Sequence, residues 1–339
     1  MEQTAFHDRR FNSIQFLRGI TALFIVLEHV RFLNCGAFGV DIFFCISGFM
    51  IMFSTHKSTK HFFTKRLIRI LHLYYGMTLL TYLLLLVFPG MFSVSSPKAE
   101  YLIKSILFIP FDIGEGAIQP LMRIGWTVNC EIFFYLIFFV ALRISHRLRG
   151  LISSLLLLLI VILAQLLPDN SVILSFYGNP VMLEFILGIL CYYIALGFHR
   201  LYSTNRLPRI CFPLAAVAIP GIFFGLLATM PINTLGFRRP LVWGLPATGL
   251  VLAFFLLEYY CKALPAALVR LGNISFSLYL LHYYPVAFLD RVVFDFSSCT
   301  PFTLFGVAIA IAVSVTLALI SHALIEQKLS LWLRKKLVC

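Results

Sequence analysis

Charged side chains are scarce in this sequence. Asp, Glu, Lys and Arg make up only 12% of its 339 residues, about half of what a soluble domain of this size carries. Hydrophobic residues make up 60% of the chain, and 35 of them are Phe. This composition excludes a soluble globular protein and predicts a polytopic membrane protein.

Cysteine motifs are also absent. The eight cysteines form no CxxC pair and no cluster with histidine. Metal sites and disulfide frameworks both depend on such spacing. The sequence therefore predicts no metal and no disulfide framework, and we interpret most of the cysteines as packing residues.

Acidic residues are few as well. The chain has 14 Asp and Glu against 27 Lys and Arg, which gives a formal net charge of +13. Such a charge is common in proteins that bind nucleic acid, but its distribution indicates another cause. If the N-terminus is cytoplasmic, most of the Lys and Arg residues lie in loops on the inner side, as the positive-inside rule demands. We therefore predict no nucleic-acid partner.

Long apolar runs, by contrast, are abundant. Ten of them have about the length needed to cross a bilayer. They lie near residues 13–33, 36–55, 70–90, 126–144, 150–167, 180–198, 211–230, 241–258, 272–290 and 302–324. We expect an all-α transmembrane helical bundle of about ten spans, with both termini cytoplasmic, that forms a single domain over residues 1–339.

Two segments outside the spans have distinct patterns. Residues 58–70 are basic and amphipathic, which predicts a helix at the inner membrane surface. Residues 91–125 form the longest external connection, which either docks an acceptor substrate or caps the bundle passively. Within this connection, Tyr101–Phe111 is apolar but too short to cross a bilayer, and we interpret it as interfacial or re-entrant.

The first span contains two ionisable side chains, Arg18 and His29. At about 100° per residue they return to the same helical face, with a rise of roughly 16 Å between them. Ionisable groups at such depth are costly in lipid and usually face a polar interior. The pair is a functional candidate. The alternatives are an arginine that snorkels to the helix end and a histidine bonded to a backbone carbonyl.

A carboxylate lies near the start of the second span, at Asp41. The connection between the two spans is short, so Asp41 and His29 are both expected in the outer half of the membrane. Asp41 can then orient the imidazole, as a carboxylate does for a histidine base. Its alternative role is to cap the second helix. Glu28 points about 100° away from His29 and is a poorer partner.

The segment before the third span is rich in cations. Offsets of four, eight and eleven residues place His61, Lys65, Arg69 and His72 on one side of a helix. The forked guanidinium groups of Arg66 and Arg69 suit phosphate oxygens. The segment therefore predicts either a phosphate-binding patch or an anchor for anionic lipid headgroups.

Two later spans carry polar residues on one face. In the fourth span, Glu131 and Tyr135 lie one turn apart after Trp126. Glu131 either takes part in chemistry or makes a structural hydrogen bond to another helix.

In the ninth span, a polar stripe joins Gly272, Ser275, Tyr279 and His282. Such a stripe faces protein or water rather than lipid. His282 either binds acceptor hydroxyl groups or bonds a backbone carbonyl, and both readings stay open here.

Taken together, these motifs resemble the acyltransferase 3 family of integral-membrane O-acyltransferases, which modify bacterial surface glycans. The resemblance covers nearly the whole chain. It rests on Arg18-x10-His29, Gly39–Phe44, Lys65-Arg66-x2-Arg69, Trp126-x4-Glu131-x3-Tyr135 and Ser275-x3-Tyr279-x2-His282. The main departure is His72, which stands where the family often has proline and leaves the entry into the third span in doubt.

The resemblance implies a chemistry. An acyl-CoA donor, by default acetyl-CoA, would bind on the cytoplasmic side, and His29 would act as general base toward a hydroxyl of a lipid-linked or polymeric saccharide. The cofactor-binding candidates are Arg18, Lys65, Arg66 and Arg69. The other catalytic candidates are Asp41 and Glu131, and the substrate-binding candidates are Trp126, Ser275, Tyr279 and His282. The expected location is the bacterial inner membrane, in contact with membrane lipids.

One other class of protein fits the buried charges. A transporter or flippase of a lipid-linked saccharide also carries ionisable residues inside its spans, where they serve as a path for substrate or protons. Such proteins usually show repeat symmetry, which is not evident here. A transporter would also move its substrate without consuming acyl-CoA.

Overall fold

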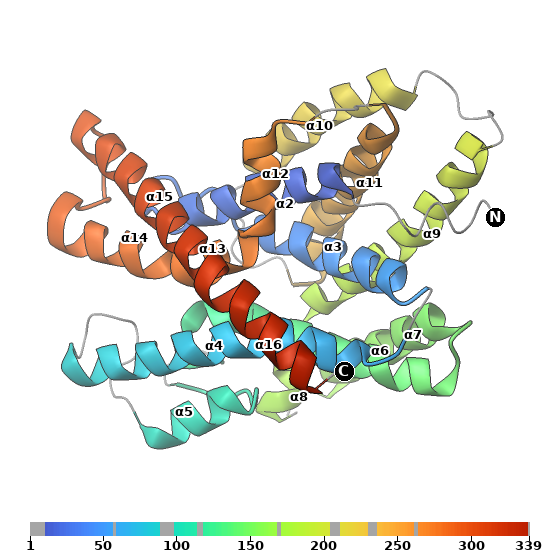
Figure 1. Ribbon diagram of the computed structural model, residues 1–339, viewed down its shortest axis with the longest axis horizontal. Coiled ribbons are helices and arrows are strands. Elements are labelled where there is room, and N and C mark those ends of the chain that lie inside the picture. Colours follow the sequence, from blue (N-terminus) through green and yellow to red (C-terminus); the bar gives the residue numbers. More distant parts are fainter. Residues whose placement is uncertain are drawn as a thin grey trace. The chain divides into compact units, whose positions relative to one another are not determined.

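The computed structural model of the protein describes residues 11–56, 59–88, 98–113, 118–167, 171–203, 211–229, 236–260 and 264–337. The regular structure of these residues is helical (Figure 1). They contain no β-strand, although Asp112 and Ile118 form an isolated bridge. The predicted all-α class is confirmed. Residues 1–10 and 338–339, at the two termini, lie outside the described residues.

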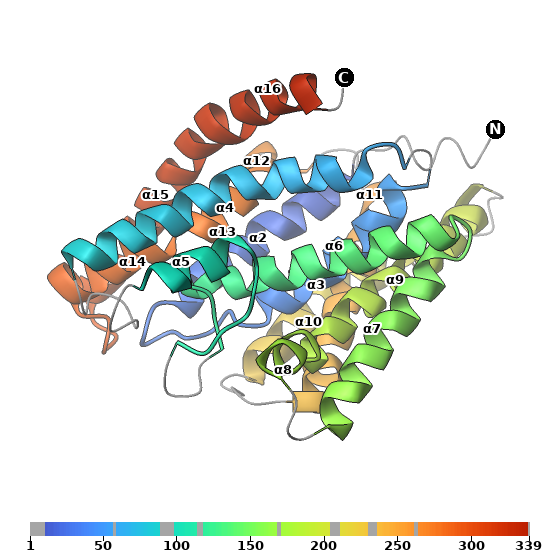
Figure 2. The ribbon, with the colours of Figure 1, turned by 90° about the horizontal axis from the view of Figure 1, so that it is seen from below.

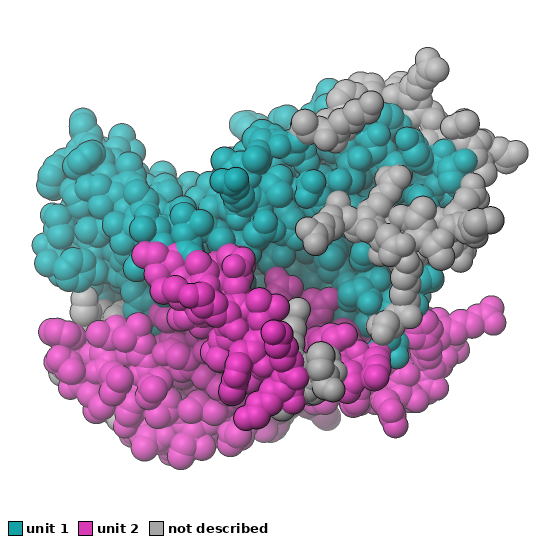
Figure 3. Space-filling view, in the orientation of Figure 1, with its two compact units in different colours: residues 1–59, 183–319 teal, residues 60–182, 320–339 magenta. Residues whose placement is uncertain are grey.

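The chain divides into two compact units, each of which combines two separate stretches of sequence (Figure 3). Unit 1 comprises residues 1–59 and 183–319, and unit 2 comprises residues 60–182 and 320–339. Because both units join segments that are distant in sequence, neither is a contiguous part of the chain. A single functional domain over residues 1–339 stays a prediction.

Unit 1 carries most of the candidate residues. Its α-helices are α2 (Asn12–Glu28), α3 (Gly39–Ser54), α9 (Leu183–Ser203), α10 (Cys211–Ala228), α11 (Leu245–Tyr260), α12 (Ala266–Asn273), α13 (Ser275–Leu281), α14 (Tyr283–Leu289) and most of α15 (Pro301–Ser321). A short turn, η3 (Gly236–Arg238), and two π-helical turns, η4 (Pro240–Gly244) and η5 (Asp290–Phe294), complete it.

Unit 2 contains three helices of 18 or more residues, α4 (Phe62–Val87), α6 (Trp126–Ile144) and α7 (Arg149–Leu166). Its shorter α-helices are α5 (Ala99–Ile106), α8 (Val172–Tyr177) and α16 (Lys328–Leu337). It also contains the turns η1 (Arg123–Gly125), η2 (Pro180–Met182) and η6 (His322–Gln327). Helices α6 and α7 run side by side after the short connection at residues 145–148 (Figure 2).

Six helical stretches of the described residues are long and apolar enough to cross a membrane. They are Phe62–Val87, Arg123–Ile144, Arg149–Leu166, Pro180–Ser203, Gly236–Tyr260 and Pro301–Leu333. Gly39–Ser54 and Leu214–Ala228 are shorter apolar helices. All ten predicted spans are mainly helical where described, although α2 has only 17 residues. A count of ten crossings and the cytoplasmic position of both termini stay predictions.

Small residues bring the helices of unit 1 into backbone contact. A Cβ atom on Gly48 of α3 would lie 2.2 Å from the carbonyl oxygen of Phe185 in α9. A Cβ atom on Gly188 would meet the carbonyl oxygen of Cys45 at the same distance. Between α2 and α12, a Cβ atom on Gly272 would lie 1.8 Å from the carbonyl oxygen of Gln15. Side chains of any size would therefore separate these helices.

The predicted span at residues 272–290 is not one continuous helix. It is divided into α12, α13 and α14, with interruptions at Ile274 and His282. Pro285 has no backbone N–H and cannot bond the carbonyl of Leu281, so the ladder is broken next to His282. The polar stripe nevertheless keeps its helical register, because Leu278 N–H donates to the carbonyl of Ile274 and His282 N–H donates to that of Leu278.

The basic amphipathic segment is the first part of a longer helix. The sequence predicts a helix over residues 58–70 that leads into the third span. In the structure, α4 runs without a break from Phe62 to Val87, so the segment and most of that span form one helix. Residues 57–58 lie outside the described residues. The helix begins at Phe62 because His61 adopts a left-handed backbone conformation, with φ of 54°. It continues through His72, whose Nδ1 lies 2.5 Å from the carbonyl oxygen of Ile68.

The connection predicted over residues 91–125 packs against its own unit. Residues 91–97 and 114–117 lie outside the described residues, and α5 has only eight residues, too few to cross a bilayer. The hydroxyl of Tyr74 donates to the carbonyl of Ser105 over 3.1 Å, and that of Tyr177 donates to the carbonyl of Phe108 over 2.6 Å. These bonds attach the connection to α4 and α8.

Candidate active site

His29 lies at the C-terminal end of α2, where the helical bonding pattern stops. Its Nδ1 atom is 3.0 Å from the carbonyl oxygen of Ile25, one turn earlier in the helix. The same Nδ1 atom is 3.2 Å from Nε2 of His282. The two imidazole rings meet nearly edge to face, with centroids 4.8 Å apart and planes inclined by 70°. Two histidines that are 253 residues apart in the sequence therefore form one pair.

The second ring nitrogen of His282 is also fixed. Its Nδ1 atom lies 3.1 Å from the carbonyl oxygen of Leu278, and the residue is fully buried. The backbone bond predicted for His282 as one of its two roles is thus present. Contact of His282 with an acceptor hydroxyl stays a prediction.

An ion-pair cluster fastens the chain segments next to the histidine pair. The guanidinium of Arg31, two residues after His29, binds both carboxylate oxygens of Asp290 at 2.9 Å and also pairs with Asp295. Asp295 has a left-handed backbone, with φ of 46°, at the end of η5. Bidentate pairs of this kind fix orientation as well as distance. The end of α2 is therefore held against the segment that follows α14.

The polar stripe of α13 belongs to the same unit. The ring of Tyr279 lies 6.4 Å from that of Phe43 and 6.0 Å from that of His282, centroid to centroid. Ser275 is fully buried, and its hydroxyl has no hydrogen-bond partner among the described residues. An unsatisfied buried hydroxyl is costly, which makes Ser275 a candidate contact for a bound molecule.

Arg18 lies on α2 together with the candidate base, as the sequence predicts. It is half-buried, and its guanidinium donates to the side-chain oxygen of Gln15 over 3.2 Å. A role in donor binding stays a prediction. The eleven-residue spacing to His29 is preserved because α2 is helical from Asn12 to Glu28 without interruption.

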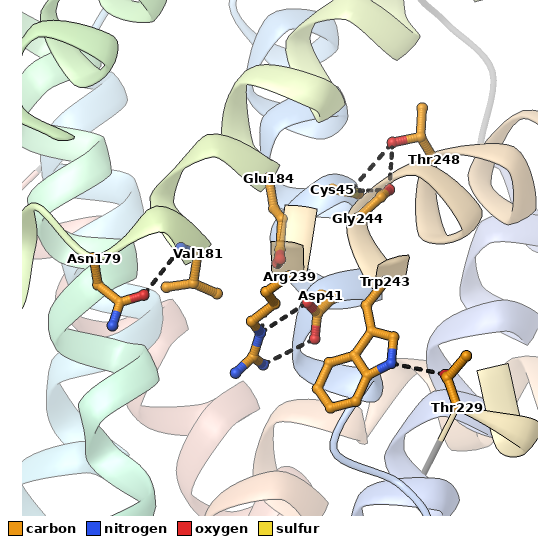
Figure 4. Close-up of polar contacts among 10 residues, drawn as sticks. All are labelled: Asp41, Cys45, Asn179, Val181, Glu184, Thr229, Arg239, Trp243, Gly244 and Thr248. Atoms are coloured by element: carbon orange, nitrogen blue, oxygen red, sulfur yellow. Dashed lines mark hydrogen bonds and ion pairs between the residues drawn. The ribbon is translucent and has the colours of Figure 1, made fainter. Parts of the chain in front are cut away.

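The predicted contact between Asp41 and His29 is wrong. The fully buried carboxylate of Asp41 accepts two hydrogen bonds from the guanidinium of Arg239, at 3.0 Å and 2.9 Å (Figure 4). Among the described residues, Asp41 makes no hydrogen bond to an imidazole. A buried carboxylate is far better satisfied by a bidentate guanidinium than by a neutral ring, which explains the outcome.

The cluster around Asp41 includes two residues that the sequence did not single out. Glu184 is also fully buried, and its carboxylate lies 3.9 Å from the Arg239 guanidinium. Arg239 additionally covers the ring of Trp243, 5.0 Å from its centroid (Figure 4). Arg239 and Glu184 come from distant segments, so no local spacing indicates either. From the sequence, the cluster could be anticipated only from the need of a buried carboxylate at Asp41 for a cation.

Glu28 also has a structural partner rather than the imidazole. Its carboxylate accepts hydrogen bonds from the backbone N–H groups of Gly36 and Ala37, at 2.7 Å and 2.9 Å. This arrangement agrees with the expectation that Glu28 is a poor partner for His29. Glu28 fixes the connection that leads into α3.

Unit 2 contains a second group of candidates on α4 and α6. The hydroxyl of Tyr135 donates to the carboxylate of Glu131, which confirms that the two lie on one face. The Arg66 guanidinium lies over the Tyr135 ring, 5.4 Å from its centroid. Lys65 is exposed on the same helix. The Arg66 guanidinium therefore lies beside the hydrogen-bonded Tyr135, and Arg69 follows three residues later on the same helix.

The predicted site residues thus form two groups, one in each unit. Unit 1 holds Arg18, His29, Asp41, Ser275, Tyr279 and His282, and unit 2 holds Lys65, Arg66, Arg69, Trp126 and Glu131. Trp126 is the first residue of α6 and is half-buried. The described residues contain no group of three His, Cys, Asp or Glu side chains that could hold a metal ion.

The helical fold of the described residues and these sites define a multi-pass membrane protein with a histidine pair, of which His282 is fully buried and His29 half-buried. The sequence profile of the acyltransferase 3 family, which is described as an acyltransferase domain, matches residues 11–320. The chain belongs to this family, as the motifs indicated, and is an acyltransferase.

One curated relative supports the same assignment. The chain is 27% identical over 292 residues to the exopolysaccharide production protein ExoZ of Rhizobium meliloti (strain 1021), a match that covers 81% of this chain and 84% of that protein. The comparison with solved structures gives no match.

Proposed function

We propose that this protein is a membrane O-acyltransferase that moves an acyl group from acyl-CoA to a hydroxyl of a saccharide. The family assignment supports acyl transfer, and the name of the ExoZ relative, an exopolysaccharide production protein, supports a saccharide acceptor. Acetyl-CoA is the default donor, and a lipid-linked or polymeric surface saccharide is the acceptor. The protein acts in the bacterial inner membrane, with the donor on the cytoplasmic side.

The observation that carries the proposal is the placement of His29. Its ring is held by the carbonyl of Ile25 and by His282 at the end of a mainly apolar helix that also carries Arg18. An imidazole fixed in this way suits general-base catalysis, because the base must be oriented toward the proton that it removes. The relative named above does not define the base, so this role rests on the geometry and on the family motif.

The reaction then follows the general-base route. His29 accepts the proton of the saccharide hydroxyl as its oxygen attacks the thioester carbonyl carbon. The tetrahedral intermediate collapses, the carbon–sulfur bond breaks, and the coenzyme A thiolate leaves. The imidazolium returns the proton to the thiolate, so His29 is regenerated and no net proton is consumed. In the covalent alternative, His29 first attacks the thioester, so that a nitrogen–acyl bond forms and the carbon–sulfur bond breaks. The saccharide hydroxyl then attacks the acyl-histidine, so that the ester bond forms and the nitrogen–acyl bond breaks.

The cationic group of unit 2 is assigned to the donor. Arg66 and Arg69 offer forked donors to the phosphate groups of coenzyme A, and exposed Lys65 adds a third positive charge. Glu131 holds the hydroxyl of Tyr135 beside Arg66. We assign to Glu131 the role of keeping the ring of Tyr135 in place beside Arg66. We assign to Arg18 a further contact with a phosphate group of the donor.

An assay of donor consumption tests the proposal against transport. The purified protein in lipid nanodiscs is given acetyl-CoA and a glycolipid extract of the producing cells, and release of the coenzyme A thiol is measured. We expect thiol release that depends on both the protein and the extract. A transporter would move the glycolipid in proteoliposomes while the acetyl-CoA concentration stayed constant, and that result would overturn the proposal.

A further inference from the structure

The hydrogen bonds of the histidine pair determine where its ring hydrogens lie. A carbonyl oxygen can only accept a hydrogen bond, so each ring nitrogen that faces a carbonyl must carry a hydrogen. Nδ1 of His282 faces the carbonyl of Leu278 at 3.1 Å, and Nδ1 of His29 faces the carbonyl of Ile25 at 3.0 Å. Both rings are therefore protonated on Nδ1.

The roles of the two nitrogens in the contact between the rings follow from this assignment. Nε2 of His282 lies 3.2 Å from Nδ1 of His29, which carries a hydrogen. Nε2 of His282 must then be the acceptor, because two N–H groups that point at each other repel. His282 is accordingly a neutral ring with one hydrogen, and the hydrogen on His29 Nδ1 is shared between the carbonyl of Ile25 and His282.

We infer that His282 is a positioning residue that, together with the carbonyl of Ile25, keeps the hydrogen of His29 on Nδ1 and thereby places the lone pair of the neutral base on Nε2. The inference rests on the proposed function of His29 and adds a partner to it. In the neutral imidazole only one nitrogen can accept a proton, so the tautomer decides which edge of the ring meets the acceptor hydroxyl. Without His282, only the carbonyl of Ile25 would hold the hydrogen on Nδ1, and the ring would lose one of its two fixed contacts.

The pair also supports the charged state that the reaction passes through. When His29 takes the hydroxyl proton on Nε2, its Nδ1–H becomes a stronger donor to Nε2 of His282. No proton moves to His282, which remains neutral and retains its bond to Leu278. The proton on His29 Nε2 leaves with the coenzyme A thiol, and the starting tautomer is restored.

The surrounding structure holds the two rings at this distance. Arg31 and Asp290 lie two and eight residues after His29 and His282, and their bidentate ion pair fastens one segment to the other. The break in the helical ladder at Pro285 lies directly after His282. Ten residues before His282, the close backbone contact of Gly272 with Gln15 holds α12 against α2.

Two substitutions at position 282 separate positioning from packing. In His282→Gln an amide oxygen can take the place of Nε2 and accept from His29, whereas His282→Leu keeps bulk and removes the acceptor. We expect His282→Leu to lower kcat by about 10- to 100-fold, since a well-placed general base contributes about 10²–10⁴. The KM for acetyl-CoA should change by less than about twofold, and His282→Gln should recover most of kcat.

His199→Leu is the matched control. It removes another buried histidine of unit 1, which is bonded to Tyr259 over 2.9 Å and has no role in the proposed reaction. We expect this variant to keep the kcat of the unsubstituted protein. Equal losses in His282→Leu, His282→Gln and His199→Leu would show that His282 only fills space, and would overturn the inference.

The tautomer can be observed directly in the unsubstituted protein, and a variant is needed only to assign the signal. Solid-state ¹⁵N NMR of histidine-labelled protein in lipid bilayers reports which ring nitrogen carries the hydrogen, and a His29→Gln sample assigns the signal. We expect neutral His29 to be protonated on Nδ1. A hydrogen on Nε2 of neutral His29 would overturn the inference even if His29 proved essential. Loss of the base role itself would instead appear as full acyl transfer by His29→Ala.

Discussion

The histidine pair and the Asp41 cluster place ionisable groups in the same unit by different means. The rings of His29 and His282 meet through one hydrogen bond, and both rings also bond backbone carbonyls. Asp41 and Arg239 meet as opposite formal charges, with a second carboxylate at Glu184. A ring that can gain and lose a proton without breaking its supports is suited to catalysis, whereas a salt bridge of full charges is suited to holding helices together.

This difference leads to opposite expectations for substitution. Changes in the histidine pair should reduce turnover and leave the fold intact, because neutral hydrogen bonds contribute little to stability. Changes in the Asp41 cluster should reduce stability, because they leave a charge buried without its partner. A variant that behaved in the other way would break the comparison.

The largest effect is expected at the base. His29→Ala should lower the rate of acyl transfer by about 10³-fold or more, within the range of general-base contributions. Its melting temperature should stay close to that of the unsubstituted protein, measured by fluorescence in detergent. Turnover within about tenfold of normal, in protein shown to be correctly inserted, would contradict the role of His29.

The next largest effect concerns stability. Arg239→Met leaves the fully buried Asp41 without its cation and should destabilise the protein by about 3–5 kcal/mol, as for other broken buried pairs. Denaturation of the purified protein measures this loss. Arg238→Met, at the exposed neighbouring position, is the control and should have little effect. The double variant Arg239→Met with Asp41→Asn should recover part of the loss, and the absence of any recovery would count against the ion pair.

A smaller effect is expected in the cationic group of unit 2. Arg66→Met and Arg69→Met should each raise the KM for acetyl-CoA by about tenfold, the equivalent of one charge-assisted hydrogen bond of about 1.4 kcal/mol, with less change in kcat. Steady-state kinetics at constant acceptor concentration measure both parameters. An unchanged KM in both variants would favour the lipid-anchor interpretation of α4.

The smallest effect is a pH dependence on α5. The Lys104 ammonium pairs with Glu100 one turn away and lowers the pKa of that exposed carboxyl. Because the folded pKa is lowered, the stabilisation is present above the ordinary pKa of Glu, about 4.3, and is lost as the pH falls through the lowered value. Lys104→Met should therefore lower the melting temperature slightly at pH 7, and this difference should disappear as the pH falls through the lowered pKa. A difference that stayed the same at every pH would exclude the ion pair as its cause.

The sequence predicted contacts that depend on local spacing. The four-residue interval between Glu131 and Tyr135 places them on one helical face, and they are hydrogen-bonded. The stripe that ends at His282 keeps its register across the interruption at Ile274, because the backbone bonds continue there. The apolar runs likewise became helices, since in lipid a chain must satisfy its own backbone groups.

Contacts between distant segments could not be predicted in the same way. The sequence indicated that buried Asp41 needs a partner, but Arg239 lies 198 residues away and no spacing rule points to it. The prediction that the nearer His29 is the partner of Asp41 is therefore wrong. The contact between His29 and His282 was not predicted for the same reason, although the sequence indicated each of them as a candidate site residue. Tertiary packing determines such contacts, and they leave no local pattern in the sequence.

The transfer itself gives the most direct test of the account. The purified protein is incubated with acetyl-CoA that carries ¹³C in the acetyl group and with the glycolipid extract, and the saccharide is analysed by mass spectrometry and NMR. The account predicts a ¹³C-acetyl ester on a saccharide hydroxyl, removable by mild base and absent with His29→Ala. A saccharide that remains unlabelled while the protein is folded and binds acetyl-CoA would contradict it.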